Sequence, residues 1–188
     1  MGIYVKRLLS YGFITSSQLK CNNQKLIEER RCSMFDHKVD ELFQGLGLSQ
    51  IMVLATSEGN RVTARSMSII IDSRKLYFQT DKNFCKYRQI KSNANVAVCY
   101  NNIQIEGICK EIGHPFEQEN NLFTQKYKEC FRSSYDKYTH LANETVFVIT
   151  PILITVWAYD NGKPYREFYD FNREKYIKEY YDISGVVG

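Results

Sequence analysis

The chain has 188 residues, of which 44% are hydrophobic and 14% aromatic, and its formal net charge is +4. That length suits one globular domain with a substantial core, and no apolar run approaches the roughly 18 residues of a membrane-spanning helix. All of the excess positive charge lies in residues 1–33, which carry six basic and two acidic side chains, so the rest of the chain is neutral overall. A neutral body removes the main electrostatic reason to expect nucleic-acid binding.

Residues 1–33 form a basic leader without the features of a targeting signal. Its apolar stretch, Leu8 to Ile14, is short and interrupted by polar residues, and no clean small-residue cleavage site follows. We expect this leader either to be disordered or weakly helical, or to be absent from the native protein. The second alternative rests on residues 28–33, because GAA GAA AGG AGG and two further codons would place a ribosome-binding sequence just before the codon of Met34. The resulting prediction is a native chain that begins at Met34.

The next hundred residues predict a helix and then a run of strands. Residues 34–46 carry apolar side chains at helical spacing and end at Gly45 or Gly47, which indicates an amphipathic helix. Period-two patterning and turn signals then predict strands, and a break after residue 80 predicts a short helix with Asp81 or Asn83 as its N-cap. The expected strands are 51–56, 61–71, 75–80 and 96–100, with the helix at 84–92.

The remainder of the chain predicts a second alternation of strands and helices. Gly107 indicates a bulge or the close approach of another backbone, and Thr150-Pro151 indicates a bulge or a break in a long apolar strand. Asn161-Gly162 is a strong hairpin signal. The expected elements are a strand at 103–112, a helix at 116–128, a loop or short helix at 133–143, strands at 146–159 and 165–171, and a polar helical tail at 172–188.

Three residues of this pattern suggest a phosphate site. Arg65 stands among small residues in the middle of a strand, which is unusual unless the arginine meets an anion or a carboxylate. Thr80 ends a strand just before the helix whose first turn carries Lys86, and a helix N-terminus favours a phosphate. Arg65, Thr80 and Lys86 are therefore expected to converge on one phosphate. The alternative is that Arg65 forms a surface ion pair and Lys86 lies on a solvated helix face.

Other site chemistries find little support in the sequence. The six cysteines form no C-x-x-C motif and do not pair with the three histidines, so we expect no metal site. Reduced thiols without a secretion signal favour a cytoplasmic location. Cys85 lies near a helix N-terminus, which can lower the pKa of a thiol, although a packing role is the alternative. No catalytic triad, Walker loop or G-x-G-x-x-G loop is present, so no catalytic residue is assigned.

The order of LAT, R-x-M-x-I, LYFQTD, K-x-x-Q-I-K-x-N and V-A-V resembles the pyridoxamine-phosphate-oxidase-like split-barrel flavoproteins, and their short general-stress-protein branch in particular. The resemblance covers about Val39 to Trp157. It implies a mainly β fold with peripheral helices (α+β), in which residues 34–171 form a Greek-key-like split β-barrel. It also implies a homodimer with FMN in the groove between the two barrels.

The same resemblance implies the residues that hold the cofactor. The strand that begins at Arg65 would line the flavin and reach its phosphate, Gln79 and Thr80 would hold the flavin at the end of a strand, and Lys86 would bind the phosphate. Trp157 matches a ring that flanks the flavin in relatives. The residues expected to bind FMN are Arg65, Ser66, Met67, Ser68, Ile69, Gln79, Thr80, Cys85, Lys86, Asn102 and Trp157.

Departures from the family pattern argue against vitamin B6 chemistry. Ile70 stands where true pyridoxamine phosphate oxidases carry a lysine, their Ser-Arg-Lys cluster is reduced to Phe84-Cys85-Lys86, and residues 165–168 lack their Arg-x-His pattern. We therefore predict an FMN-binding oxidoreductase that acts on an unidentified small molecule, with the redox chemistry supplied by the flavin. FMN is preferred to FAD because no dinucleotide fingerprint is present. The alternatives are a non-catalytic flavin- or ligand-binding sensor or stress protein of the same fold, and a cofactor-free interaction domain.

Overall fold

The computed structural model describes residues 34–181, and a helix at residues 34–46 opens this part of the chain, as its apolar periodicity predicts. Gly47 ends the helix with a φ of 73° and donates its backbone N–H toward the carbonyls of Phe43 and Gln44. The apolar face of the helix packs into the main core through Phe35, Val39, Phe43 and Leu46. The predictions for residues 1–33, including the start at Met34, and for residues 182–188 lie outside the described residues.

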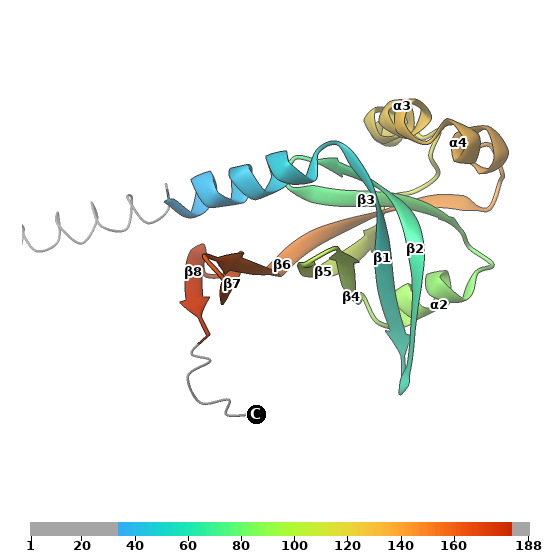
Figure 1. Ribbon diagram of the computed structural model, residues 1–188. Helices are drawn as coiled ribbons and strands as arrows, with labels where there is room; N and C mark the ends of the chain where they lie inside the picture. The colour runs from blue at the N-terminus through green and yellow to red at the C-terminus, as the bar shows by residue number, and fades with distance from the viewer. Residues whose placement is uncertain (1–33, 182–188) are drawn as a thin grey trace, which may run out of the picture.

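Within residues 34–181, eight strands form one antiparallel sheet with the spatial order β3-β2-β1-β4-β5-β6-β7-β8. A further pairing between β3 and β6 closes the first six strands into a barrel (Figure 1). The mainly β class and the barrel architecture are thereby confirmed. The strands are β1 (Ser49–Glu58), β2 (Arg61–Asp72), β3 (Lys75–Asp81), β4 (Asn95–Tyr100), β5 (Ile103–Glu111), β6 (Glu144–Asp160), β7 (Lys163–Asp170) and β8 (Lys175–Tyr180).

The remaining helices are short and lie outside the barrel wall. They are α2 (Cys85–Ser92), η1 (Gln118–Asn120), α3 (Asn121–Cys130) and α4 (Arg132–Tyr138). The predicted N-cap of α2 is wrong, because the N-cap residue is Phe84 and makes no side-chain cap bond. The Asp81 carboxylate instead accepts the backbone N–H of Asn83 at 2.7 Å and stabilises the turn before the helix. No helix in residues 34–181 is long and apolar enough to cross a membrane.

The longest strand, β6, serves two parts of the sheet. Its first half pairs with β3 and its second half with β7, while β5 runs beside both. The register with β5 shifts at Gly107, which lies opposite Pro151, while Glu106 lies opposite Leu153, so Ile152 is the extra residue of a bulge. The predicted bulge at Thr150-Pro151 is confirmed.

The expected helical tail is wrong in the part that the structure describes. Residues 175–180 form β8, which pairs antiparallel with β7, so the sheet continues past the predicted domain end at residue 171. Cross-strand contacts stabilise this hairpin: the Tyr169 and Tyr176 rings lie 5.2 Å apart, and both hydroxyls donate to the Glu167 carboxylate.

Two core clusters divide the buried side chains. The larger cluster fills the barrel, with Phe78, Phe147 and Ile149 among its fully buried members. The smaller cluster lies outside the barrel wall beneath α3 and joins Ile70, Val146, Phe123 and Tyr127. The two faces of β2, β3 and β6 are therefore both covered near α3.

Candidate functional site at the split between β2 and β3

β2 and β3 pair only beside the turn that joins them. Their ladder runs from Asp72 opposite Lys75 to Ile70 opposite Tyr77 and stops there. Beyond that point β3 keeps its pairing with β6 on its other edge and β2 keeps its pairing with β1, so β2 and β3 diverge (Figure 1). The edge of β2 before Ile70 thus faces the split, and no strand of residues 34–181 pairs with it there. Backbone N–H and C=O groups on such an edge are available to a ligand.

Alternation along β2 divides the predicted cofactor residues between two faces. Met67 packs against the barrel core and Ile69 is fully buried in it, so these side chains point inward. Ser66 and Ser68 lie on the opposite face, and Ser68 interacts with the Tyr127 hydroxyl of α3. Met67 and Ile69 therefore present mainly their backbone groups to the split.

The end of β3 brings Gln79 and Thr80 to the same region. Both side chains are buried. The Gln79 Oε1 accepts a hydrogen bond from the Thr139 hydroxyl at 3.0 Å, which ties the end of β3 to the end of α4. Thr80 lies on the inward face, next to the strand end from which the chain turns toward α2. These contacts fix the wall of the split opposite β2.

Arg65 lies at the split with its guanidinium turned toward the barrel and α2. It donates hydrogen bonds to the Leu54 carbonyl at 3.2 Å and to the Thr56 hydroxyl at 2.7 Å, and it also donates to the Thr63 hydroxyl. Gln89 of α2 lies behind these threonines and accepts a hydrogen bond from each of their hydroxyls. Arg65 therefore brings positive charge to the split, while its terminal N–H groups bind the barrel itself.

Lys86, in the first turn of α2, is the second cation at the split. Within the described residues it forms no ion pair, and its Nζ lies 4.4 Å from the centre of the Phe84 ring. Burial lowers the pKa of Lys86, and the charge of Arg65 lowers it further, whereas Glu144 and Asp81 oppose the shift. Lys86 is thus half-buried beside a second cation rather than solvated. Cys85 precedes it as the first, half-buried residue of the helix.

Two polar residues of this region were missed by the sequence reasoning. Glu144 is only 4% exposed, and its Oε2 has no hydrogen-bond partner among the residues that the structure describes. Burial and the charge of Asp81 raise the pKa of Glu144 to about 7. Gln89 is 1% exposed and its Nε2 also lacks a partner. Two features of the sequence could have identified them: Glu144 is a carboxylate at the start of an apolar strand, and Gln89 lies on the apolar side of a short helix. A ligand could supply the missing hydrogen bond to each of these two buried atoms.

Asn102 and Trp157 do not join the other predicted residues. Asn102, in the turn between β4 and β5, accepts the backbone N–H of Trp157 at 3.0 Å, and its side-chain amide donates to the Trp157 carbonyl. The exposed Trp157 ring stacks on Tyr181, with 5.1 Å between ring centres. Trp157 lies twelve residues along β6 from Thr145, the partner of Thr80. At about 3.3 Å per residue, that is about 40 Å along the strand.

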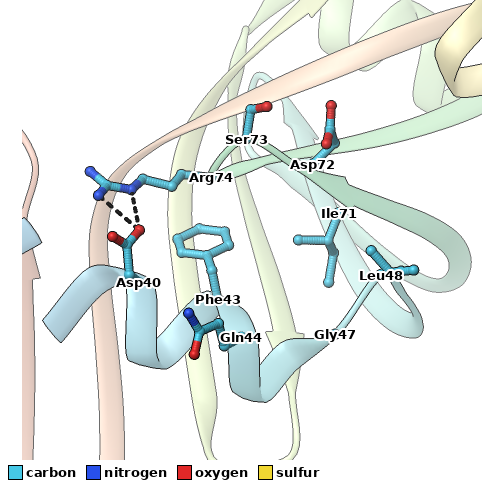
Figure 2. Close-up of a pocket in the computed structure, with 9 residues that line it drawn as sticks. All are labelled: Asp40, Phe43, Gln44, Gly47, Leu48, Ile71, Asp72, Ser73 and Arg74. Carbon is cyan, nitrogen blue, oxygen red and sulfur yellow. Dashed lines mark hydrogen bonds and ion pairs between the residues drawn. The ribbon is translucent and has the colours of Figure 1, made fainter. Parts of the chain in front are cut away.

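A cavity of about 690 Å³ lies elsewhere, between the helix at residues 34–46 and the turn that joins β2 to β3 (Figure 2). Among the lining residues that the structure describes, Arg74 is the one cation, and it is held by Asp36 at 2.6 Å and by Asp40 at 2.8 Å. Asp72 also lines the cavity. Lining carboxylates and a neutralised arginine do not favour a phosphate, so we place the candidate site at the split. Within residues 34–181, no three potential metal ligands cluster together.

Comparison with known proteins supports this architecture. A family model for pyridoxamine 5'-phosphate oxidase matches residues 35–158, whereas no curated protein matches the chain. A pyridoxamine 5'-phosphate oxidase-related, FMN-binding protein from Nostoc punctiforme superposes with a TM-score of 0.50 at 16% identity, over 78% of this chain and 94% of that one.

The heme storage protein HutZ from Vibrio cholerae gives a TM-score of 0.50 at 11% identity, over 59% of this chain and 86% of that one. General Stress Protein 26 from Bacillus anthracis gives a TM-score of 0.49 at 21% identity, over 63% of this chain and 89% of that one. The Nostoc and Vibrio structures share the split-barrel fold. The family model matches well over half of this chain, and the chain therefore belongs to the pyridoxamine 5'-phosphate oxidase family.

Proposed function

We propose that this chain is a flavoprotein that binds FMN at the split between β2 and β3. The observation that carries the proposal is the pair of half-buried cations, Arg65 and Lys86, that meet there without a carboxylate at ion-pair distance in residues 34–181. Burial lowers the pKa of both groups, and the charge of Arg65 adds to the shift on Lys86. A phosphate between them would relieve the repulsion.

The residues of the split fit a flavin mononucleotide. Lys86 and the first N–H groups of α2 would hold the phosphate, with Arg65 supplying charge from behind. The unpaired edge of β2 at residues 66–69 and the buried Gln79 would hold the rest of the molecule through backbone and amide groups. FMN, when bound, supplies hydride and electron transfer, and the protein supplies binding, orientation and the exclusion of water.

The proposal includes a homodimer, because one chain does not bring all of the predicted residues together. Asn102 and Trp157 lie far along β6 from Thr80 and Lys86, so a site that uses both groups draws on two copies. The outward face of β1 and β2 offers a surface for this contact, since Ile51, Val53 and Val62 are 55%, 42% and 68% exposed. Exposed apolar patches of this kind mark interfaces.

We propose oxidoreductase activity on a small molecule other than a B6 vitamer. Ile70, at the position of the family's lysine, is 1% exposed within the core cluster beneath α3. Such a side chain offers no charge to a phosphorylated pyridoxal-like substrate. The family membership supports the reaction class, and the substitution at this position supports a different substrate.

The test is a cofactor titration of the purified full-length protein. We expect absorbance near about 450 nm from bound flavin, and tight binding of added FMN by protein from which the flavin has been removed. Riboflavin, which lacks the phosphate, should bind roughly 10- to 150-fold more weakly, the equivalent of about 1.5–3 kcal/mol. Failure to bind FMN at all would overturn the proposal.

The reaction class needs a second measurement. Anaerobic addition of NADH or NADPH to the FMN-loaded protein should bleach the flavin band if the protein uses a nicotinamide donor. An FMN-loaded protein that resists these donors and a panel of other reductants would favour the non-catalytic, ligand-binding alternative.

A further inference from the structure

Glu144 is the buried carboxyl of the candidate site, and its position follows from the seam of the barrel. It opens β6, and its cross-strand partner on β3 is Asp81. Val146, two residues further on the same face, packs beneath α3, so Glu144 points away from the barrel interior. The side chain is 4% exposed and its Oε2 is unpartnered. The Oε2 atom therefore has neither water nor a hydrogen-bond donor among the described residues, which is unfavourable for a charged carboxylate.

Within residues 34–181, three titratable groups interact electrostatically with Glu144. They are Asp81 from β3, Lys86 from α2 and the neutral Tyr127 hydroxyl from α3. Lys82, in the turn after β3, is directed elsewhere, because its Nζ lies 3.7 Å from the Glu111 carboxylate. Lys86 is therefore the cation that offsets Glu144, and it is also the lysine proposed to bind the phosphate.

Competition for Lys86 links Glu144 to the cofactor. When a phosphate dianion approaches Lys86, the local charge consists of the phosphate, Asp81 and Glu144 against Lys86 and Arg65. An additional buried negative charge beside the phosphate is unfavourable, and the carboxyl can remove it by accepting a proton. Glu144 should therefore bind a proton more tightly in the complex than in the free protein.

We propose that Glu144 takes up a proton from solvent when the phosphate of FMN binds, so that the site selects the phosphorylated cofactor less strongly as the pH rises above neutral. This inference rests on the proposed FMN site and adds a residue that regulates it. The proton bound to Glu144 remains on the carboxyl while the cofactor is bound. Its loss weakens binding because an ionised Glu144 repels the phosphate across Lys86.

Isothermal titration of the flavin-free, full-length protein with FMN tests the proposal. At pH 8, the observed heat is measured in two buffers that differ in ionisation enthalpy, and the difference gives the number of protons taken up. The free phosphate is already a dianion there, because its second pKa is about 6. We expect uptake of a substantial fraction of one proton with FMN and none with riboflavin. Equal uptake with riboflavin, or none with FMN, would overturn the inference.

Variants identify the group that binds the proton. Glu144→Gln should abolish the uptake and keep the Kd for FMN nearly constant from pH 7 to 8.5, where the wild-type Kd should rise by up to about tenfold per pH unit. Glu129→Gln removes one exposed carboxylate of α3 and should behave like the wild type. A wild-type pH dependence that survives in Glu144→Gln overturns the assignment. FMN that binds without any proton uptake refutes only this inference, whereas the absence of FMN binding at every pH refutes the proposed function.

Discussion

Glu144 and Asp81 are cross-strand partners where β6 meets β3 and closes the barrel. Directly opposed residues of an antiparallel pair lie on the same face, so two carboxyl groups are neighbours at the seam. Burial of Glu144 is the larger cause of its raised pKa, and the charge of Asp81 adds to it. The stability of the pairing between β3 and β6 at this seam should therefore depend on pH.

The first prediction concerns stability. Folding raises the pKa of Glu144 from 4.5 to about 7, so the folded state binds more protons than the unfolded state between these values. Below pH 4.5 the contribution of Glu144 to the free energy of unfolding should be fully present. This contribution should fall by at most about 3 kcal/mol as the pH rises to 7. Glu144→Gln should therefore match the wild type near pH 5 and exceed it at pH 8. Urea unfolding across this range is the measurement, and two parallel profiles would contradict the expectation.

The second prediction separates Lys86 from an ordinary surface lysine. Lys86→Ala should weaken FMN binding roughly 10- to 150-fold, because it removes a charge-assisted hydrogen bond worth about 1.5–3 kcal/mol. Lys82→Ala is the matched control, since that lysine lies in the preceding turn and faces Glu111. Fluorescence titration with FMN at two salt concentrations compares them. Equal Kd values for the two variants would show that Lys86 does not contact the phosphate.

The third prediction concerns Arg65, which binds the barrel as well as facing the split. Arg65→Ala should weaken FMN binding and also destabilise the apo-protein by about 1–3 kcal/mol, because Thr56 and Gln89 lose a buried partner. Lys86→Ala, in contrast, should leave the urea midpoint of the apo-protein nearly unchanged. An Arg65→Ala variant of wild-type stability would mean that the hydrogen-bond network contributes nothing to folding.

The fourth prediction tests the bulge in β6. A Cβ on Gly107 would lie 2.6 Å from the Thr150 carbonyl oxygen and 2.7 Å from the Ile149 Cγ2. Gly107→Ala should therefore destabilise the protein by about 1–3 kcal/mol through overpacking. Gly45→Ala is the control, because that helical glycine has open space around it, and the change should be neutral or stabilising by up to about 1 kcal/mol. Thermal melting of both variants decides the matter.

The fifth prediction concerns the second copy of the chain. Val53→Lys places a charge in the middle of the exposed face of β1, where the wild-type side chain is 42% exposed and apolar. Folding should be preserved, while sedimentation should shift from dimer to monomer and FMN affinity should fall with it. A Val53→Lys protein that remains dimeric and keeps its FMN affinity would place the dimer contact on another face.

Local patterning predicted most of the fold. The strands of the first half follow from alternation and turn residues, and the helix at residues 34–46 follows from its apolar spacing. β8 was not predicted, because its sequence, KYIKEY, shows no clear period-two alternation and its residues bury little surface. Its strand state depends on cross-strand contacts with Tyr169 and Glu167, which a local pattern does not contain.

The candidate site was predictable in composition but not in arrangement. Spacing along the chain places Thr80 and Lys86 near one strand end, and in the structure Arg65 of β2 is close enough for its charge to act on Lys86. The inward network of Arg65 requires Gln89, from a helix whose docking position no local pattern specifies. The burial of Glu144 likewise follows from the pairing of β3 with β6, two strands far apart in the sequence.

The extra residue Ile152 has a consequence for how β6 pairs with its neighbours. Because the bulge absorbs the change in register with β5, β6 acts as two strands joined end to end, one closing the barrel and one carrying the β7–β8 hairpin. The hairpin is nevertheless tied to the barrel, because Tyr169 belongs to the main core cluster and Tyr176 packs against that cluster. The change of partner from β3, whose pairing ends at Ile149, to β7, whose pairing begins at Leu153, thus takes place inside one continuous strand rather than at a loop.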